Sequence, residues 1–158
     1  MLSLQKLQEE GLVPLDVGNT GGSVAFGEYY CIYWGSLRPE EIGKMSFTDE
    51  DFYCIYLQIE NGTADGHPFQ RVAVKMSINE DEAGHPFEKE RVRDARKQIQ
   101  DYFACNIAGC QRTRFQFSSP KLNKERASWL TICRFEFDDD NYQKRISAVQ
   151  KAFDALKK

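Results

Sequence analysis

One change in the spacing of the apolar residues constrains the fold of this chain more than any other feature of its sequence. Between residues 70 and 79 apolar and polar residues alternate, which predicts a strand whose buried face carries Val72, Val74, Met76 and Ile78. Between residues 87 and 103 the period becomes helical, which predicts an apolar stripe of Val92, Ala95, Ile99 and Tyr102 or Phe103. Each element has one apolar face, and both faces are buried when the helix packs on a sheet.

The same criteria predict six further elements. A short helix is expected over residues 2–10, and a closing helix capped by residues 138–141 has the apolar stripe Tyr142, Ile146, Val149, Phe153 and Leu156. Strands are expected over residues 24–34, 52–60, 114–118 and 128–137. An Asn61–Gly62 turn is expected directly after the strand over residues 52–60. The order α-β-β-β-α-β-β-α predicts an α+β domain of two layers, in which helices cover one face of an antiparallel sheet of about five strands.

The composition is that of one globular domain. The chain has 158 residues, of which 41% are hydrophobic, and it contains no Ser-, Gln- or Pro-rich linker, so we expect a single domain over residues 1–158. Residues 1–10 mix Leu with polar residues, unlike the apolar stretch of a signal peptide, and no run of 18 apolar residues occurs. With an odd number of cysteines, five, these observations predict a soluble cytoplasmic protein without a membrane partner.

The segment from Leu15 to Thr20 combines an acidic residue with small residues that expose backbone. It resembles the phosphate-binding turn of the actin-like kinase superfamily, especially that of type III pantothenate kinases, and the resemblance implies a phosphate and metal site at Asp16. A kinase of that superfamily needs two lobes, which 158 residues cannot hold, and Pro14 is unfavourable in the strand that would precede the turn. The alternative interpretation, a Gly-rich surface turn, is therefore preferred.

The two histidines lie in two copies of the tetrapeptide Gly-His-Pro-Phe. The copies flank one predicted strand, so His67 and His85 are expected roughly 25 Å or more apart, too far to share a metal ion. Gly before and Pro after each histidine instead predict the boundaries of structural elements. Cys105 and Cys110 have a Cys-x4-Cys spacing that is not typical of zinc sites. The sequence therefore assigns no catalytic residue, no metal ligand and no cofactor.

The charges are segregated along the chain. Residues 1–87 contain 5 Lys/Arg and 14 Asp/Glu, whereas residues 88–126 contain 10 Lys/Arg and 5 Asp/Glu. On the predicted helix we expect the cations, together with Gln100, to lie opposite the apolar stripe, where they would meet a partner. The candidate partner-binding residues of this basic segment are Lys89, Arg93, Arg96, Lys97, Arg112, Arg114, Lys121, Lys124 and Arg126.

The order of elements, with a Trp-Leu-Thr-Ile strand followed by an Asp/Asn-capped helix, resembles two known groups. One is the uncharacterised C-terminal domain of restriction-endonuclease-like bacterial proteins, to which residues 128–156 correspond. The other is the acidic secretion-chaperone fold, whose members dimerise and bind partner proteins. The first resemblance implies a bacterial or phage accessory domain and not a nuclease core, because the chain has no Asp-x-Lys or Glu-x-Lys triplet.

These observations predict a non-catalytic intracellular binding protein that acts on a protein partner. A homodimer is a further association that the second resemblance implies. The first alternative is a nucleic-acid-contacting accessory protein of a restriction-like or defence system, because ten cations in one segment could neutralise phosphates. The second alternative is an enzyme whose site is assembled from residues scattered in the sequence.

Overall fold

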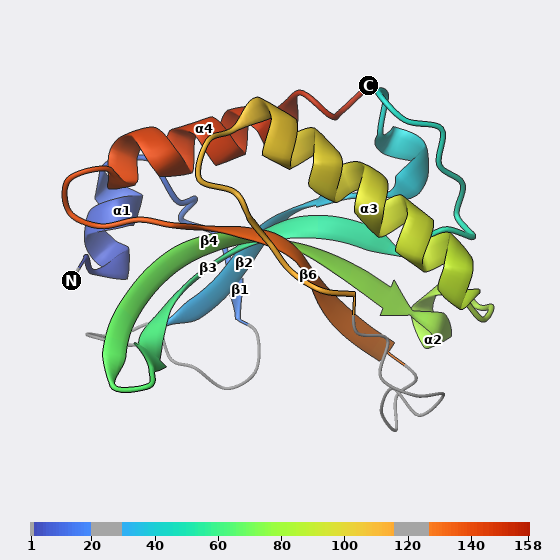
Figure 1. Cartoon of the computed structure of the whole chain (residues 1–158), viewed down its shortest axis with the longest axis horizontal. Coiled ribbons are helices and arrows are strands. Elements are labelled where there is room, and N and C mark those ends of the chain that lie inside the picture. The colour runs from blue at the N-terminus through green and yellow to red at the C-terminus, as the bar shows by residue number, and fades with distance from the viewer. Residues whose placement is uncertain (1, 20–29, 116–126) are drawn as a thin grey trace.

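The structure, a computed structural model, describes residues 2–19, 30–115 and 127–158 (Figure 1). Six strands form one antiparallel sheet in the order β1-β2-β3-β4-β6-β5. The strands are β1 (Gly18–Asn19), β2 (Cys31–Leu37), β3 (Cys54–Ala64), β4 (His67–Asn79), β5 (Gln111–Arg112) and β6 (Ala127–Glu136). The helices are α1 (Leu4–Glu9), the 3-10 helix η1 (Pro39–Glu41), α2 (Glu80–Ala83), α3 (Lys89–Asn106) and α4 (Tyr142–Asp154).

The α+β class and the order of the expected helices and strands are confirmed. Figure 1 shows α3 and α4 on the same side of the curved sheet. Two hydrogen bonds fix α4: the Trp34 indole of β2 donates to Gln150 at 2.8 Å, and the Tyr102 hydroxyl of α3 donates to the Ala152 carbonyl at 2.7 Å. Among the described residues, no helix is long and apolar enough to cross a bilayer.

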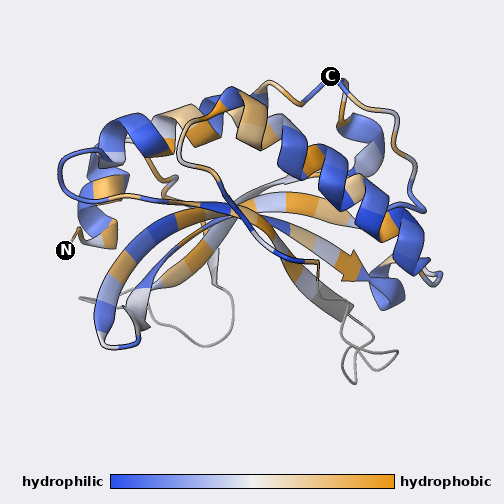
Figure 2. Ribbon diagram, viewed as in Figure 1, coloured by the Kyte–Doolittle hydropathy of each residue, from blue (hydrophilic) through white to orange (hydrophobic). Residues whose placement is uncertain are grey.

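The core lies between these helices and the sheet. The expected face of β4 is fully buried, and so are the stripe of α3 and the stripe of α4. Figure 2 shows hydrophobic and hydrophilic segments alternating along both helices, as expected of helices with one apolar face. The buried residues of α4 and its C-terminal end include all five that the sequence predicts: Tyr142, Ile146, Val149, Phe153 and Leu156.

The β3–β4 hairpin is longer than the sequence analysis predicts, and the expected Asn61–Gly62 turn is wrong. Both residues are in β3, paired with Gln70 and Phe69. The turn lies at Asp65–Gly66, where both residues have positive φ, 52° and 77°. Asp-Gly is a strong signal for a two-residue hairpin loop, because Gly accepts the left-handed backbone that such a loop requires.

Two other strands differ from expectation. The strand expected over residues 24–34 starts at Cys31, and residues 24–29 lie outside the described ranges. Of the strand expected over residues 114–118, residues 114 and 115 are not extended strand, and residues 116–118 lie outside the described ranges; the two-residue β5 comes just before them. The Thr113 hydroxyl donates to the Thr131 and Ile132 carbonyls of β6, so a side chain takes the place of the backbone ladder there.

Candidate functional site

A groove opens at the edge of the sheet where β5 ends. Its volume is about 440 Å³, and its lining comes from β5, the segment after β5, and β6. We call it the arginine groove, and its lining residues are Arg112, Thr113, Arg114, Trp129, Leu130, Thr131 and Arg134.

The arginine groove contains three guanidinium groups, and one of them, that of Arg112, is paired with a carboxylate. Arg112 donates to Asp101 at 2.6 Å, and hydrogen bonds from Arg112 and Lys97 hold the pKa of Asp101 below its ordinary value. Arg114 is exposed and Arg134 is half-buried, and within the described part of the chain neither forms an ion pair. The groove is therefore positively charged and has cations available for an anionic group.

Trp129 is the most exposed aromatic residue of the described chain, with 53% of its surface accessible. It faces outward because of a β-bulge: the register between β4 and β6 shifts between Val74 and Lys75, which pair with Cys133 and Thr131. Ile132 is the extra residue at the bulge. A regular alternation along the strand expected over residues 128–137 would place residues 129, 131, 133, 135 and 137 on one face, but only the last three are buried. The bulge turns Trp129 and Thr131 to the side opposite the core, where Arg134 also lies between the buried Cys133 and Phe135.

Side chains from α3 support the wall of the groove. Arg96 donates from Nη2 to the Thr113 carbonyl, to Thr113 Oγ1 at 2.6 Å and to the Thr131 carbonyl at 3.1 Å. Gln100 donates to the Thr113 carbonyl at 3.0 Å and to the Ile132 carbonyl at 2.7 Å. Both side chains are buried, so the expectation that they lie opposite the apolar stripe is wrong. Burial lowers the pKa of Arg96. Its hydrogen bonds hold the lining residues Thr113 and Thr131 in place from the α3 side of the groove.

The other predicted cations of α3 remain on its surface. Lys89, Arg93 and Lys97 are exposed; Arg93 pairs with Glu90 at 2.8 Å, and Lys97 pairs with Asp101 at 3.0 Å. The Arg93 guanidinium also lies 4.9 Å from the centre of the Phe115 ring, just beyond the groove. The remaining three candidates, Lys121, Lys124 and Arg126, lie outside the described residues. Of the nine candidates, the structure brings Arg112 and Arg114 into one groove.

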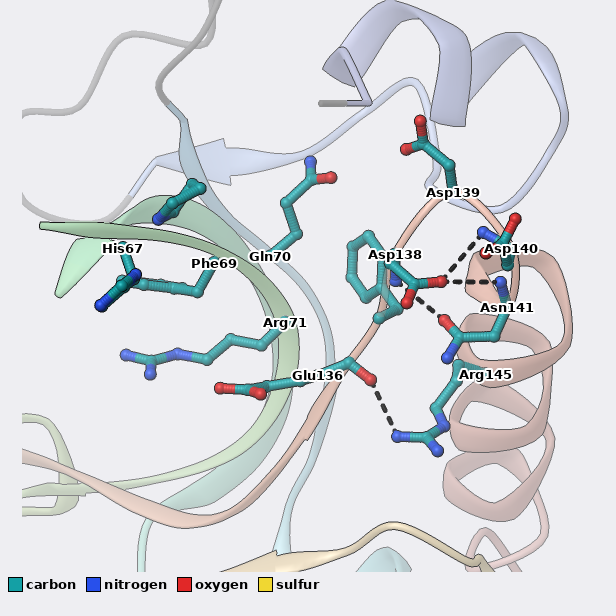
Figure 3. Close-up of a pocket in the computed structure, with 12 residues that line it drawn as sticks. His67, Phe69, Gln70, Arg71, Glu136, Asp138, Asp139, Asp140, Asn141 and Arg145 are labelled. Atoms are coloured by element: carbon teal, nitrogen blue, oxygen red, sulfur yellow. Dashed lines mark hydrogen bonds between the residues drawn. The ribbon is translucent and has the colours of Figure 1, made fainter.

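A second and larger hollow of about 920 Å³ lies at the opposite end of β6 (Figure 3). Its acidic residues build the start of α4: Asp138 accepts hydrogen bonds from the backbone of Asp140 at 2.9 Å and of Asn141 at 3.2 Å. Arg145, also in this hollow, donates to the Glu136 carbonyl at 2.8 Å. These bonds make Asp138 and Arg145 structural groups of the β6–α4 connection.

The histidines and the Gly-rich segment occupy separate places. His67 begins β4 and His85 follows α2, at opposite ends of β4, and no group of three His, Cys, Asp or Glu in the described ranges is placed to hold a metal ion. Gly18 is in β1 against the Tyr33 ring, which leaves no room for a Cβ atom. Residues 20–23 of the expected Gly-rich turn lie outside the described ranges.

The five cysteines form no disulfide in the described structure. Cys105 is exposed, whereas Cys110 is half-buried beside the buried thiol of Cys133. The hydrogen bond between these two thiols lowers the pKa of Cys110 to about 7.

Comparison with known proteins finds no match among family models, curated proteins or solved structures.

Proposed function

We propose that this chain is a non-catalytic binding protein whose partner is a protein, and that the arginine groove holds an acidic segment of that partner. The observation that carries the proposal is the exposed Trp129 indole among three arginines, of which Arg114 and Arg134 form no ion pair in the described structure. Trp and Arg are the residues most enriched among those that contribute most to binding at protein interfaces.

The groove also has the rigidity that such an interface needs. Trp129 is on β6, which is paired with β4 along its length, and the Arg96 and Gln100 side chains hold the opposite wall. A rigid aromatic side chain loses little conformational entropy on binding, and arginine can hold a carboxylate through two parallel hydrogen bonds.

Nucleic acid is the alternative partner, because a base could stack on Trp129 while phosphates meet the arginines. The rest of the chain argues against a long polyanion. The net charge is −3, and the first 87 residues carry 14 acidic against 5 basic residues. A short acidic protein segment gains the attraction of the groove without bringing many charges near the acidic part of the protein.

The test is affinity capture from the native cell extract with two variants of equal charge. Arg114→Glu/Arg134→Glu reverses the two groove cations without ion pairs, and Lys144→Glu/Lys151→Glu reverses two exposed cations of α4. We expect one partner protein to be captured by the wild type and by the α4 variant but lost with the groove variant. Capture that is equal in all three proteins would contradict the site. Loss of a nucleic acid and not of a protein from the groove variant would favour the alternative.

A further inference from the structure

The arginine groove lies along a strand edge that β5 covers only in part. β5 pairs with β6 through two residues: Gln111 with Arg134, and Arg112 with Cys133. β4 pairs with β6 on the other side from Arg71 to Asn79. Among the described residues, no strand therefore pairs with the first half of β6 on its outer edge.

The pairing of Ser77 shows which way the backbone of Trp129 points. Ser77 is opposite Trp129 in the β4–β6 ladder, but the Ser77 carbonyl accepts a hydrogen bond from the Tyr53 amide at 2.9 Å, on the β3 side. The N–H and C=O of one strand residue point to the same side, so Ser77 makes no ladder bonds to β6. The N–H and C=O of Trp129 consequently point away from β4, to the open edge.

The open edge has a defined end. The Thr131 carbonyl points the same way as the backbone of Trp129, and it already accepts hydrogen bonds from Thr113 Oγ1 and Arg96 Nη2. Side chains thus satisfy the Thr131 carbonyl next to β5, and the described residues leave the backbone N–H and C=O of Trp129 for another donor and acceptor.

We propose that the partner's acidic segment binds as an added strand, pairing its backbone with Trp129 at the edge of β6. This proposal rests on the function proposed above and specifies how the partner is recognised. An extended peptide on a sheet edge gains affinity from main-chain hydrogen bonds and specificity from alternate side chains. Acidic side chains on the outer face of such a strand reach the guanidinium groups of Arg114 and Arg134, so the charge of the groove selects the peptide.

Two synthetic peptides of equal length and charge test the strand geometry: a repeat of Glu-Val and a repeat of Glu-Pro. Both bring carboxylates, but Pro cannot donate a ladder hydrogen bond. We expect the Glu-Val repeat to bind at least about tenfold more tightly, because each ladder bond adds to the binding free energy. We also expect the backbone amide of Trp129 to exchange rapidly with solvent in the free protein and more slowly, by at least about tenfold, when the Glu-Val repeat is bound.

The outcomes separate this inference from the proposed function. Equal binding of both peptides, lost in Arg114→Glu/Arg134→Glu and without protection of the Trp129 amide, would overturn the added strand and leave the acidic-segment site standing. An amide of Trp129 that is already protected in the dilute free protein would show that the edge is occupied, and would overturn the inference. Protection that appears only as the free protein dimerises would assign the edge to a second copy of the chain, with the same consequence. If an oligothymidylate binds the groove and neither peptide does, both proposals fail.

Discussion

Arg96 should be a structural residue of the groove wall and not a contact residue, although it belongs to the basic segment. Its side chain is 5% exposed, and a single nitrogen, Nη2, donates to two acceptors on Thr113 and one on Thr131. Arg96→Ala removes the link between α3 and β6 at this point. We therefore expect Arg96→Ala to lower the stability of the protein, whereas the same change at an exposed contact residue would leave the stability nearly unchanged.

The size of the loss follows from these contacts. A hydrogen bond from a charged donor is worth about 1.5–3 kcal/mol, but the three bonds share one nitrogen and do not add. Thr131 keeps a donor in Thr113 Oγ1, and the buried Arg96 Nε has no acceptor in the described structure, so its removal relieves a desolvated donor. Loss of the buried aliphatic stem adds about 1 kcal/mol or more. We expect Arg96→Ala to lower the free energy of unfolding by about 2–4 kcal/mol.

Urea unfolding followed by circular dichroism measures this change, and Arg93→Ala on the same helix is the matched control. Arg93 is exposed and pairs with Glu90 on the surface, so its removal should cost less than about 1 kcal/mol. Arg96→Met keeps an apolar stem and loses the donor, which separates packing from hydrogen bonding. If Arg96→Ala and Arg93→Ala have the same unfolding midpoint and slope, the reasoning about the groove wall is refuted.

Three other expectations follow from the structure. Phe153→Ala should lower the free energy of unfolding by about 3–5 kcal/mol, because the ring is buried in the core, and an unmoved urea midpoint would show that α4 does not pack there. His67→Ala/His85→Ala should leave the metal content of the purified protein unchanged, as measured by elemental analysis, and stoichiometric metal lost in the double variant would contradict this. The hydrogen bond from the Tyr142 hydroxyl holds the pKa of Glu10 below its ordinary value of 4.5, so its stabilising contribution is complete above that value and is lost as the pH falls through the lowered pKa. Tyr142→Phe should raise the pKa of Glu10 in an NMR titration, and an unchanged titration would rule out this role.

The elements that sequence analysis predicted correctly are those with a regular period over many residues. The alternation in β4 and the helical stripes of α3 and α4 depend on burial of whole faces, which neighbouring structure cannot easily override. The Asp65–Gly66 turn was missed because Asn61–Gly62 is an equally good local signal. Asn61 is kept in the strand by tertiary contacts, since it exchanges hydrogen bonds with the backbone of Tyr30.

Prediction of the site was less complete, for two physical reasons. Arg96 lies four residues after Val92, so the helical period places it beside the apolar stripe. Its charge nevertheless favoured an exposed position, because the hydrogen-bond acceptors that allow its burial come from other elements and cannot be seen in the helix sequence. Trp129 was not assigned to the site because an inserted residue reverses the inward and outward alternation of β6 before Cys133, and no local sequence signal marked that insertion.

The β-bulge at Ile132 determines both which β6 side chains enter the core and which line the groove. It keeps Cys133 and Phe135 inside while Trp129 turns out, and it leaves neighbouring carbonyls of β6 without a regular ladder. Thr113, Arg96 and Gln100 supply donors to these carbonyls, so the sheet is complete at this point with an edge strand of only two residues. Had a longer β5 satisfied the same carbonyls, it would also have covered the backbone of Trp129. The buried polar side chains of α3 therefore make the short edge strand stable, and among the described residues this short edge strand leaves the groove uncovered.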